Sequence, residues 1–222
     1  MQKGGFANKQ MNTKLIAKRN LVLRKVLNNQ ENIDILKDFI EAILDIQIAE
    51  IKLNPYLEKK ANNLPAEENF GIGDVRIKTK REEELNVGIQ FIDGGYVQTK
   101  ILIYYAQIHS NQIEYGDNRE IARTTTINIL DFHYFESFRY HKKIHIPCCN
   151  ELKFKEEEAE FHIIELPKFN AIYPNKMTRE EQWVAFLKGE NKECVETAKN
   201  KNEKIKRLDE LLNLYWEKEK ME

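Results

Sequence analysis

Residues 71–92 read GIGDVRIKTKREEELNVGIQFI, and this stretch decides the fold. Apolar and polar residues alternate across 72–78 and again across 85–92, with the two-residue period of a β-strand whose two faces meet different surroundings. The run 80–84 between them is charged and is typical of a hairpin connection. We therefore predict two neighbouring antiparallel strands at the centre of the chain.

Two polar side chains fall on the same face of this predicted hairpin. Asp74 and Gln90 both lie on the polar side of their strands, and side chains on one face of paired strands lie close together. The pair therefore predicts a carboxylate and an amide that meet across the hairpin. Two other interpretations stay open, because Asp74 also fits the end of a turn after Gly71 and Gly73, and Gln90 also fits an ordinary polar group of the core.

The remaining segments predict an α/β fold around the hairpin. We expect helices over 15–46 with a break at 28–32, a strand over 48–53, a helix over 96–115, strands over 124–132, 139–146 and 160–166, and charged helices from 178 to 222. Three adjacent strands followed by a crossover helix and a fourth strand give a mixed sheet with helices packed on it. This order matches the core of restriction-endonuclease-like folds.

Chain length and the predicted elements suggest three segments. We expect a polar N-terminal segment over 1–14, a single α/β domain over 15–177, and a charged helical extension over 178–222. In that extension Leu208 and Leu212 belong to a short apolar stripe, which predicts self-association and a homodimer.

Composition points to an ordinary intracellular globular protein. Lys and Arg total 35 against 36 Asp and Glu, so any nucleic-acid contact must come from a local basic face rather than from net charge. Cys148 and Cys149 are adjacent and Cys194 stands apart, a spacing that fits neither a disulfide framework nor a zinc site. No apolar run reaches the length of a membrane span. We expect a cytoplasmic location, no membrane association and no small-molecule cofactor.

Several short motifs occur in an order that resembles one known family. They are LKDFIEAIL (36–44), DVR (74–76), NVGIQ (86–90), YY (104–105), INILDF (127–132) and ELPKF (165–169). Residues 15–169 thereby resemble the PD-(D/E)XK nuclease family transposases, also called recombination-promoting nucleases. The resemblance implies a restriction-endonuclease-like core and a DNA endonuclease that depends on Mg²⁺ or Mn²⁺.

The resemblance also assigns roles to individual residues. Asp74 and a glutamate on the next strand would bind the metal, the main-chain carbonyl of Ile89 would assist, and Gln90 would position the attacking water. Gly88 stands where the family has that glutamate. Glu41 on the first helix is a candidate for an additional catalytic carboxylate, and it also fits an ordinary solvated helix residue.

The substitution at Gly88 leaves two functions open. One is a metal-dependent endonuclease of the transposase or recombination type. The other is a catalytically silent relative that binds nucleic acid or a partner protein. For either function DNA is the expected partner, with Lys78 and Lys100 as candidate contacts; Lys100 is the cation nearest to where the family has an arginine in the crossover helix.

Overall fold

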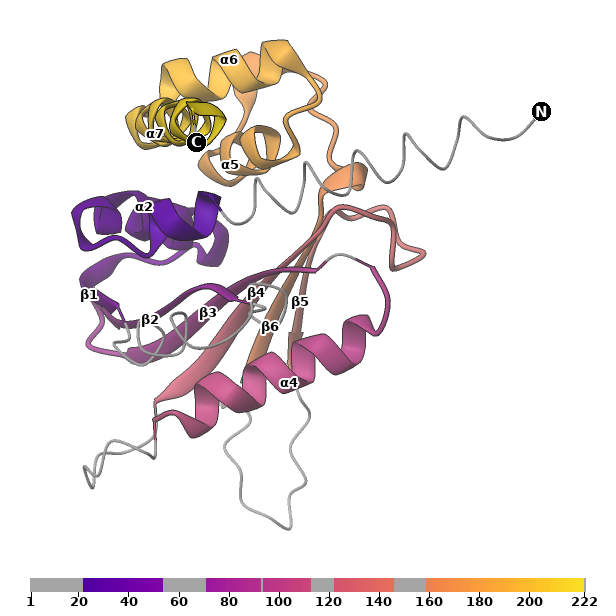
Figure 1. The fold of residues 1–222 in the computed structure, drawn as a ribbon. Coiled ribbons are helices and arrows are strands. Elements are labelled where there is room, and N and C mark those ends of the chain that lie inside the picture. Colours follow the sequence, from indigo (N-terminus) through magenta and orange to yellow (C-terminus); the bar gives the residue numbers. More distant parts are fainter. Residues whose placement is uncertain (1–21, 54–70, 93, 113–121, 146–158, 222) are drawn as a thin grey trace.

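The computed structural model describes residues 22–53, 71–92, 94–112, 122–145 and 159–221 (Figure 1). The predicted polar segment 1–14 lies outside these residues.

A mixed sheet forms the centre of the described chain. Its six strands lie in the order β1-β2-β3-β4-β6-β5. They are β1 (Ile48–Leu53), β2 (Gly71–Thr79), β3 (Glu84–Ile92), β4 (Arg123–Leu130), β5 (His141–His145) and β6 (Ala159–Glu165). Strands β1 to β3 form an antiparallel meander, β3, β4 and β6 run parallel, and β5 pairs antiparallel with β6. The predicted α/β class and the meander with its crossover are confirmed.

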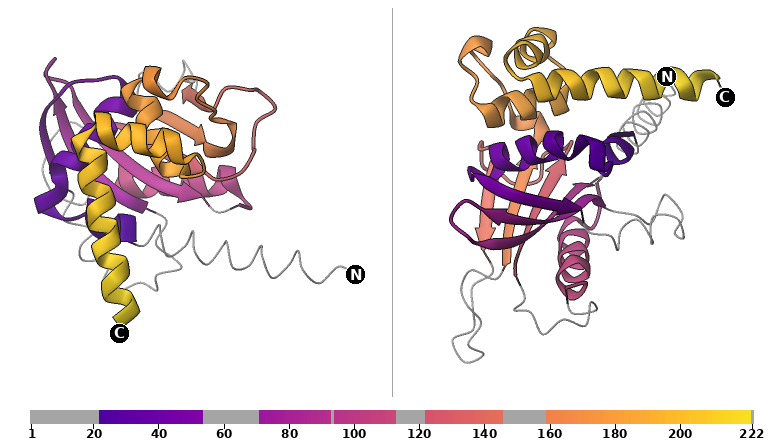
Figure 2. Two further views of the ribbon diagram at one scale, coloured as in Figure 1. Left: turned by 90° about the horizontal axis from the view of Figure 1, so that it is seen from above. Right: turned by 90° about the vertical axis from the view of Figure 1, so that its left-hand side faces the viewer.

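Helices cover both faces of this sheet. They are α2 (Ile33–Leu44), α4 (Val97–Ser110), α5 (Arg179–Lys188), α6 (Lys192–Lys201) and α7 (Glu203–Met221). Helix α4 lies against one face, α2 lies against the other, and α5 to α7 lie beyond α2 (Figure 1). The right-hand view of Figure 2 shows the same succession of layers. None of the described helices combines the length and the hydropathy that a membrane span requires.

The alternation of the strands sorts their side chains between these layers. Val75 and Val87 join the large apolar core between the sheet and α2, whereas Asp74, Asn86 and Gln90 are buried polar residues on the α4 side. Asn86 donates a hydrogen bond from Nδ2 to the carbonyl of Ile108 at 2.8 Å. The α4 face therefore carries buried polar groups that need partners, which is where a functional site can form.

The C-terminal helices belong to the same core as the sheet. Leu208 and Leu212 on α7 are 0% and 6% exposed and join the apolar cluster that includes α2 and α5. The apolar stripe that we expected on the surface is therefore covered within the chain. The central leucines of the stripe already have intramolecular partners, so their burial gives no support to self-association, and the homodimer stays a prediction.

A single aspartate connects α2 with α5 and with the junction between α6 and α7. Asp38 on α2 accepts hydrogen bonds at Oδ2 from Trp183 Nε1 at 2.8 Å and Asn202 Nδ2 at 2.9 Å, and at Oδ1 from Arg179 Nη2 at 2.5 Å. The Asp38 side chain is 14% exposed. A carboxylate withdrawn from water is costly unless it is satisfied, and here both of its oxygens are.

We predict that Asp38→Ala destabilises the fold by about 2–4 kcal/mol, because it leaves two buried side-chain donors without their acceptor. Urea unfolding followed by tryptophan fluorescence measures the loss. Glu210→Ala, at an exposed position of α7, serves as the control and should change the free energy of unfolding by less than about 0.5 kcal/mol. Equal effects of the two substitutions would contradict the role of Asp38.

Candidate functional site

The hairpin brings the predicted acid and amide to one face of the sheet. Asp74 on β2 directly opposes Gly88 on β3, and Gln90 is two residues further along β3. A bulge between Gly71 and Gly73 brings Gly71 opposite Gln90. Asp74 is 1% exposed and Gln90 is 0% exposed, so both lie beneath α4. The sequence-based expectation for their relative position is met, and their complete burial is the new finding.

Tyr104 of α4 fills the space beside these residues. A methyl group on Gly88 would lie 2.8 Å from Cε1 and 3.0 Å from Oη of Tyr104, and 2.6 Å from Cδ1 of Ile108. A methyl group on Gly71 would lie 2.6 Å from Oη and 2.8 Å from Cε2 of the same ring. Carbon atoms do not approach that closely without displacement. Only glycine at both strand positions leaves room for this ring, as expected where another group closely approaches a strand.

The hydroxyl group of Tyr104 also engages the main chain at the site. It donates a hydrogen bond to the carbonyl of Ile89 at 3.1 Å. Burial raises the pKa of Tyr104 well above its ordinary value, and the nearby negative charge of Asp74 raises it further, against the opposing charge of Arg24. Tyr104 therefore stays protonated and remains a donor to the carbonyl that was predicted to assist metal binding.

Gln90 is held by the neighbouring strand. Its Nε2 donates to Oδ1 of Asn128 on β4 at 2.6 Å, and Asn128 Nδ2 donates to Thr126 Oγ1 at 2.9 Å and to the carbonyl of His162 at 3.1 Å. The Oε1 atom of Gln90 is buried and accepts no hydrogen bond from the described residues. The amide group is thus fixed on one side and has a single acceptor left for another group.

A divalent cation does not fit these residues as they are arranged. Mg²⁺ prefers octahedral oxygen coordination with one or two carboxylates, and Gly88 supplies no carboxylate. Tyr104 occupies the space beside Gly88 and caps the Ile89 carbonyl. The side-chain oxygens of Asp74 and Gln90 remain as candidate ligands, which is one carboxylate where the resemblance implies two. Within the described ranges, no three His, Cys, Asp or Glu side chains converge as a metal site.

Glu41 lies away from this group and has other partners. Its Oε1 accepts a hydrogen bond from the backbone N–H of Ile48 at 2.8 Å, and its Oε2 accepts one from Arg179 at 3.1 Å. It belongs to α2, which covers the opposite face of the sheet from Asp74 (Figure 1). The geometry connects Glu41 to β1 and α5 rather than to Asp74, and its catalytic role stays a prediction.

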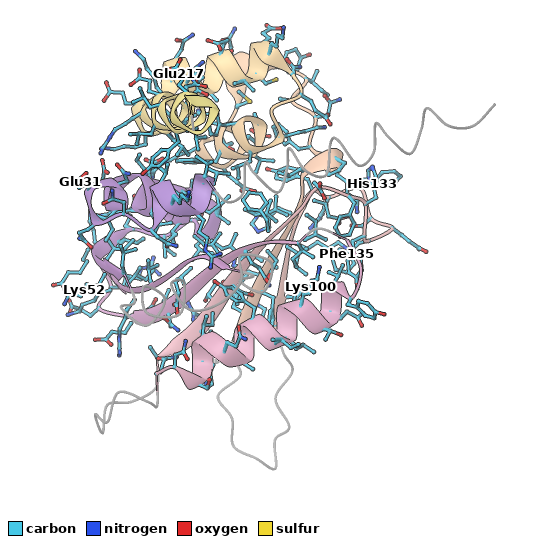
Figure 3. All side chains as sticks on the ribbon, in the orientation of Figure 1. Glu31, Lys52, Lys100, His133, Phe135 and Glu217 are labelled. Carbon is cyan, nitrogen blue, oxygen red and sulfur yellow. The ribbon has the colours of Figure 1, made fainter. Side chains whose placement is uncertain are left out.

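The two predicted DNA-contacting lysines lie at opposite ends of β3. Lys78 pairs with Glu84 at the start of β3 and forms an ion pair with Glu82 in the hairpin. Lys100 is in the first turn of α4, after the end of β3, and its Nζ donates to the carbonyl of Gly94 at 3.3 Å. Figure 3 shows Lys100 at this end of α4, on the other side of the view from Lys52 of β1. The structure does not bring Lys78 and Lys100 into one cluster.

The role of Tyr104 escaped the sequence-based prediction, although the sequence contains a signal for it. Gly71 and Gly88 both interrupt strands on their polar faces, and a glycine inside a strand often marks the close approach of another group. Two such glycines on neighbouring strands indicate one bulky group above both. The alternation alone cannot say which residue of the following helix provides that group.

The comparisons with known proteins give one match. Residues 18–222 match the family described as "PD-(D/E)XK nuclease family transposase". No curated protein and no solved structure matches the chain. The match extends through α7, so it includes the C-terminal helices as well as the sheet.

We predict that Gly88→Ala lowers the free energy of unfolding by about 1–3 kcal/mol, because the added methyl group meets Tyr104 and Ile108. The cost should fall in a Tyr104→Ala background, where the ring is absent. Urea denaturation of the four members of this double-mutant cycle measures the coupling. Additive effects of the two substitutions would show that Tyr104 does not fill the space above Gly88.

Proposed function

We propose, from the premise that this chain belongs to the PD-(D/E)XK nuclease family transposases, that it binds DNA without cleaving it. The family supports a nuclease-type domain with DNA as its substrate. We propose more specifically that DNA binding is retained while the altered site does not support cleavage.

One observation carries the proposal, namely the ring of Tyr104 in the space between Gly71 and Gly88. Hydrolysis of a phosphodiester requires charge neutralisation at the phosphate and an activated water, and metal ions supply both in nucleases. Removal of a single electrostatic group costs about 10²–10³ in rate. Here the second carboxylate is replaced by glycine, and the neighbouring carbonyl of Ile89 is already bonded to Tyr104.

DNA binding does not depend on those metal ligands. Contacts of lysine and arginine with phosphates supply most of the non-specific affinity of DNA-binding proteins, and they act through charge alone. Lys78 and Lys100 are partly exposed side chains outside the Tyr104 contact and are the candidate contacts. Because they lie at opposite ends of β3, they would meet phosphates that are well separated along the DNA.

The competing function is a metal-dependent endonuclease. The placement of Asp74 and Gln90 on one face of the hairpin favours it. In that case Tyr104 must leave its position when DNA and metal bind, and cleavage must depend on Asp74. The two functions therefore make opposite predictions for the same assay.

We predict no nicking of supercoiled plasmid by the purified chain in Mg²⁺ or Mn²⁺ above the level of Asp74→Asn. Because metal is not required for the phosphate contacts, a fluorescein-labelled duplex should still bind in EDTA, as measured by anisotropy at low salt. Cleavage that is lost in Asp74→Asn would establish the endonuclease instead. Absence of binding at low salt would contradict the proposed role in DNA binding.

The same binding assay tests the two candidate lysines. Lys78→Ala and Lys100→Ala should each weaken binding several-fold and reduce the slope of log affinity against log salt by about one. Lys52→Ala is the matched control, because Lys52 also stands beside a glutamate on a strand, with its side chain 78% exposed, and is not a predicted contact. An equal effect at Lys52 would show that only the total charge matters.

We further predict that an acid at position 88 cannot recreate a metal site while Tyr104 remains. Gly88→Glu alone should leave Mn²⁺ affinity at the parent level, whereas Gly88→Glu with Tyr104→Ala should raise it about tenfold or more. Titration calorimetry measures both affinities. Gly88→Gln with Tyr104→Ala is the control, because it has the same shape without the charge. A full gain from Gly88→Glu alone would show that Tyr104 is no obstacle.

A further inference from the structure

Four titratable side chains form an unbroken chain of contacts on the α5 side of the sheet. Glu180 Oε1 of α5 lies 2.8 Å from Nδ1 of His141, and His141 Nε2 lies 2.9 Å from Nδ1 of His162. His162 Nε2 lies 2.6 Å from Oε1 of Glu160. The chain thus runs from a helix, through one histidine on β5, to a histidine and a glutamate on β6.

The number of protons in this chain follows from its three contacts. An ionised carboxylate only accepts, so His141 must donate from Nδ1 to Glu180 and His162 must donate from Nε2 to Glu160. The contact between the two rings needs one further proton, on one of the two facing nitrogens. Three protons on two imidazoles mean that exactly one of the two rings is an imidazolium.

Both departures from this state disrupt the contact between the rings. With two neutral rings, two nitrogen lone pairs face each other at 2.9 Å. With two imidazolium rings, two N–H groups face each other and two positive charges are adjacent. The contacts in the structure therefore correspond to a single protonation state of the pair.

Burial decides which ring holds the extra proton. His162 is 3% exposed, and burial lowers its pKa although the hydrogen bond with Glu160 opposes the change. The neutral ring is therefore His162, and the imidazolium is His141, whose side chain is 17% exposed and faces Glu180. Other charged or titratable groups at the chain are Arg123 of β4 and Lys143 of β5, both near Glu160, and Tyr140, which is hydrogen bonded to Glu180.

Glu160 stays ionised throughout the pH range of interest. Burial acts to raise its pKa, but the hydrogen bonds from His162 and Lys143 outweigh burial and lower the pKa to about 2. Glu160 is therefore a hydrogen-bond acceptor for His162 throughout this range.

We propose that Glu180, His141, His162 and Glu160 form a pH-sensitive joint between α5 and the β5–β6 edge. The joint is strongest while the two rings together hold three protons, because the rings are then hydrogen bonded to each other and the bond from His141 to Glu180 is charge-assisted. The joint lies on the opposite face of the sheet from Tyr104 and is independent of the proposed DNA-binding function. It gives the C-terminal helices a connection to the sheet that responds to pH, in addition to the apolar core.

The joint is strongest at intermediate pH. Because burial lowers the pKa of His162, the unfolded chain binds more protons than the folded chain just below pH of about 6.5, and this contribution to stability falls as the pH falls. At alkaline pH the two rings lose the third proton, and the hydrogen bond between the rings disappears. The contribution of the joint to stability therefore falls as the pH rises. The expected profile is bell-shaped.

We predict that the nitrogen resonances of ¹⁵N-labelled histidines in the full chain show both nitrogens of His141 protonated, and only Nε2 of His162 protonated, near neutral pH. Amides of β5 and α5 should exchange with solvent about tenfold faster at pH 9 than at the optimum, after correction for the intrinsic rate. The wild-type protein suffices for both measurements.

Variants provide the second arm of the test. His141→Gln and His162→Gln should lose the bell-shaped profile of local exchange, because glutamine does not titrate, whereas His133→Gln, on an exposed loop, should retain it. Two neutral rings near neutral pH in the wild type, or an unchanged profile in both variants, would overturn the proposal. If neither variant folds, the nitrogen resonances of the wild type decide alone.

Discussion

The ring of Tyr104 rests against the backbones of Gly71 and Gly88, and its hydroxyl group bonds to the carbonyl of Ile89. These contacts make positions on two strands and one helix depend on each other. A side chain on either glycine would enter the ring, and a smaller residue at 104 would leave a cavity that costs about 3–5 kcal/mol. The same ring thus stabilises the packing of α4 and occupies the place that a second metal-binding carboxylate would need. Under the proposed function, the stability of this packing and the absence of cleavage have one physical cause.

The largest apolar core lies on the other face of the sheet from that site, because the sheet uses its two faces differently. The face toward α2 is apolar and continues into α5 to α7, where Asp38 satisfies donors from two further elements. The face toward α4 contains Asp74, Asn86 and Gln90, and short hydrogen bonds such as that from Gln90 of β3 to Asn128 of β4 hold these polar groups. A change at Gly88 therefore alters the chemistry of one face while the apolar core on the other face remains. Under the proposed function, this separation explains how the fold persists when the residues beneath α4 are altered.

The sequence predicted what depends on local periodicity. Alternation in 71–92 predicted the hairpin and the common face of Asp74 and Gln90, because a strand has only two faces and neighbouring residues must use different ones. It did not predict that α4 would bring Tyr104 over Gly71 and Gly88, because that contact depends on how a helix docks after a crossover. The two glycines indicated a close approach without identifying the group that approaches.

Two further features were not predicted, namely what covers the Leu208 stripe and the contact between His141 and His162. Both depend on packing between segments that are far apart in the sequence. The stripe around Leu208 was recognised as apolar, but an amphipathic helix shows only that a face is buried and not what covers it; here α7 packs within its own chain. His141 and His162 are 21 residues apart and match no ligand motif, and they meet only through the antiparallel pairing of β5 with β6. Which strands pair depends on their order in the sheet, and the spacing of residues in the sequence does not reveal that order.

A short series of hydrogen bonds connects Gln90 beneath α4 with the histidine joint on the α5 side of the sheet. Asn128 accepts from Gln90 on the α4 face and donates to the main-chain carbonyl of His162, whose ring belongs to the joint on the α5 face. A backbone shift at His162 would therefore change the distance to Asn128 before it changed any other contact of Gln90. The pairing of β4 with β6 holds the carbonyl of His162 in place, so the loss of a contact at the His162 ring alone leaves its bond with Asn128 intact. A loss of the histidine joint should therefore loosen α5 and β5 while the contact of Tyr104 with Gly88 remains. The histidine joint and the Tyr104 site can thus be tested independently of each other.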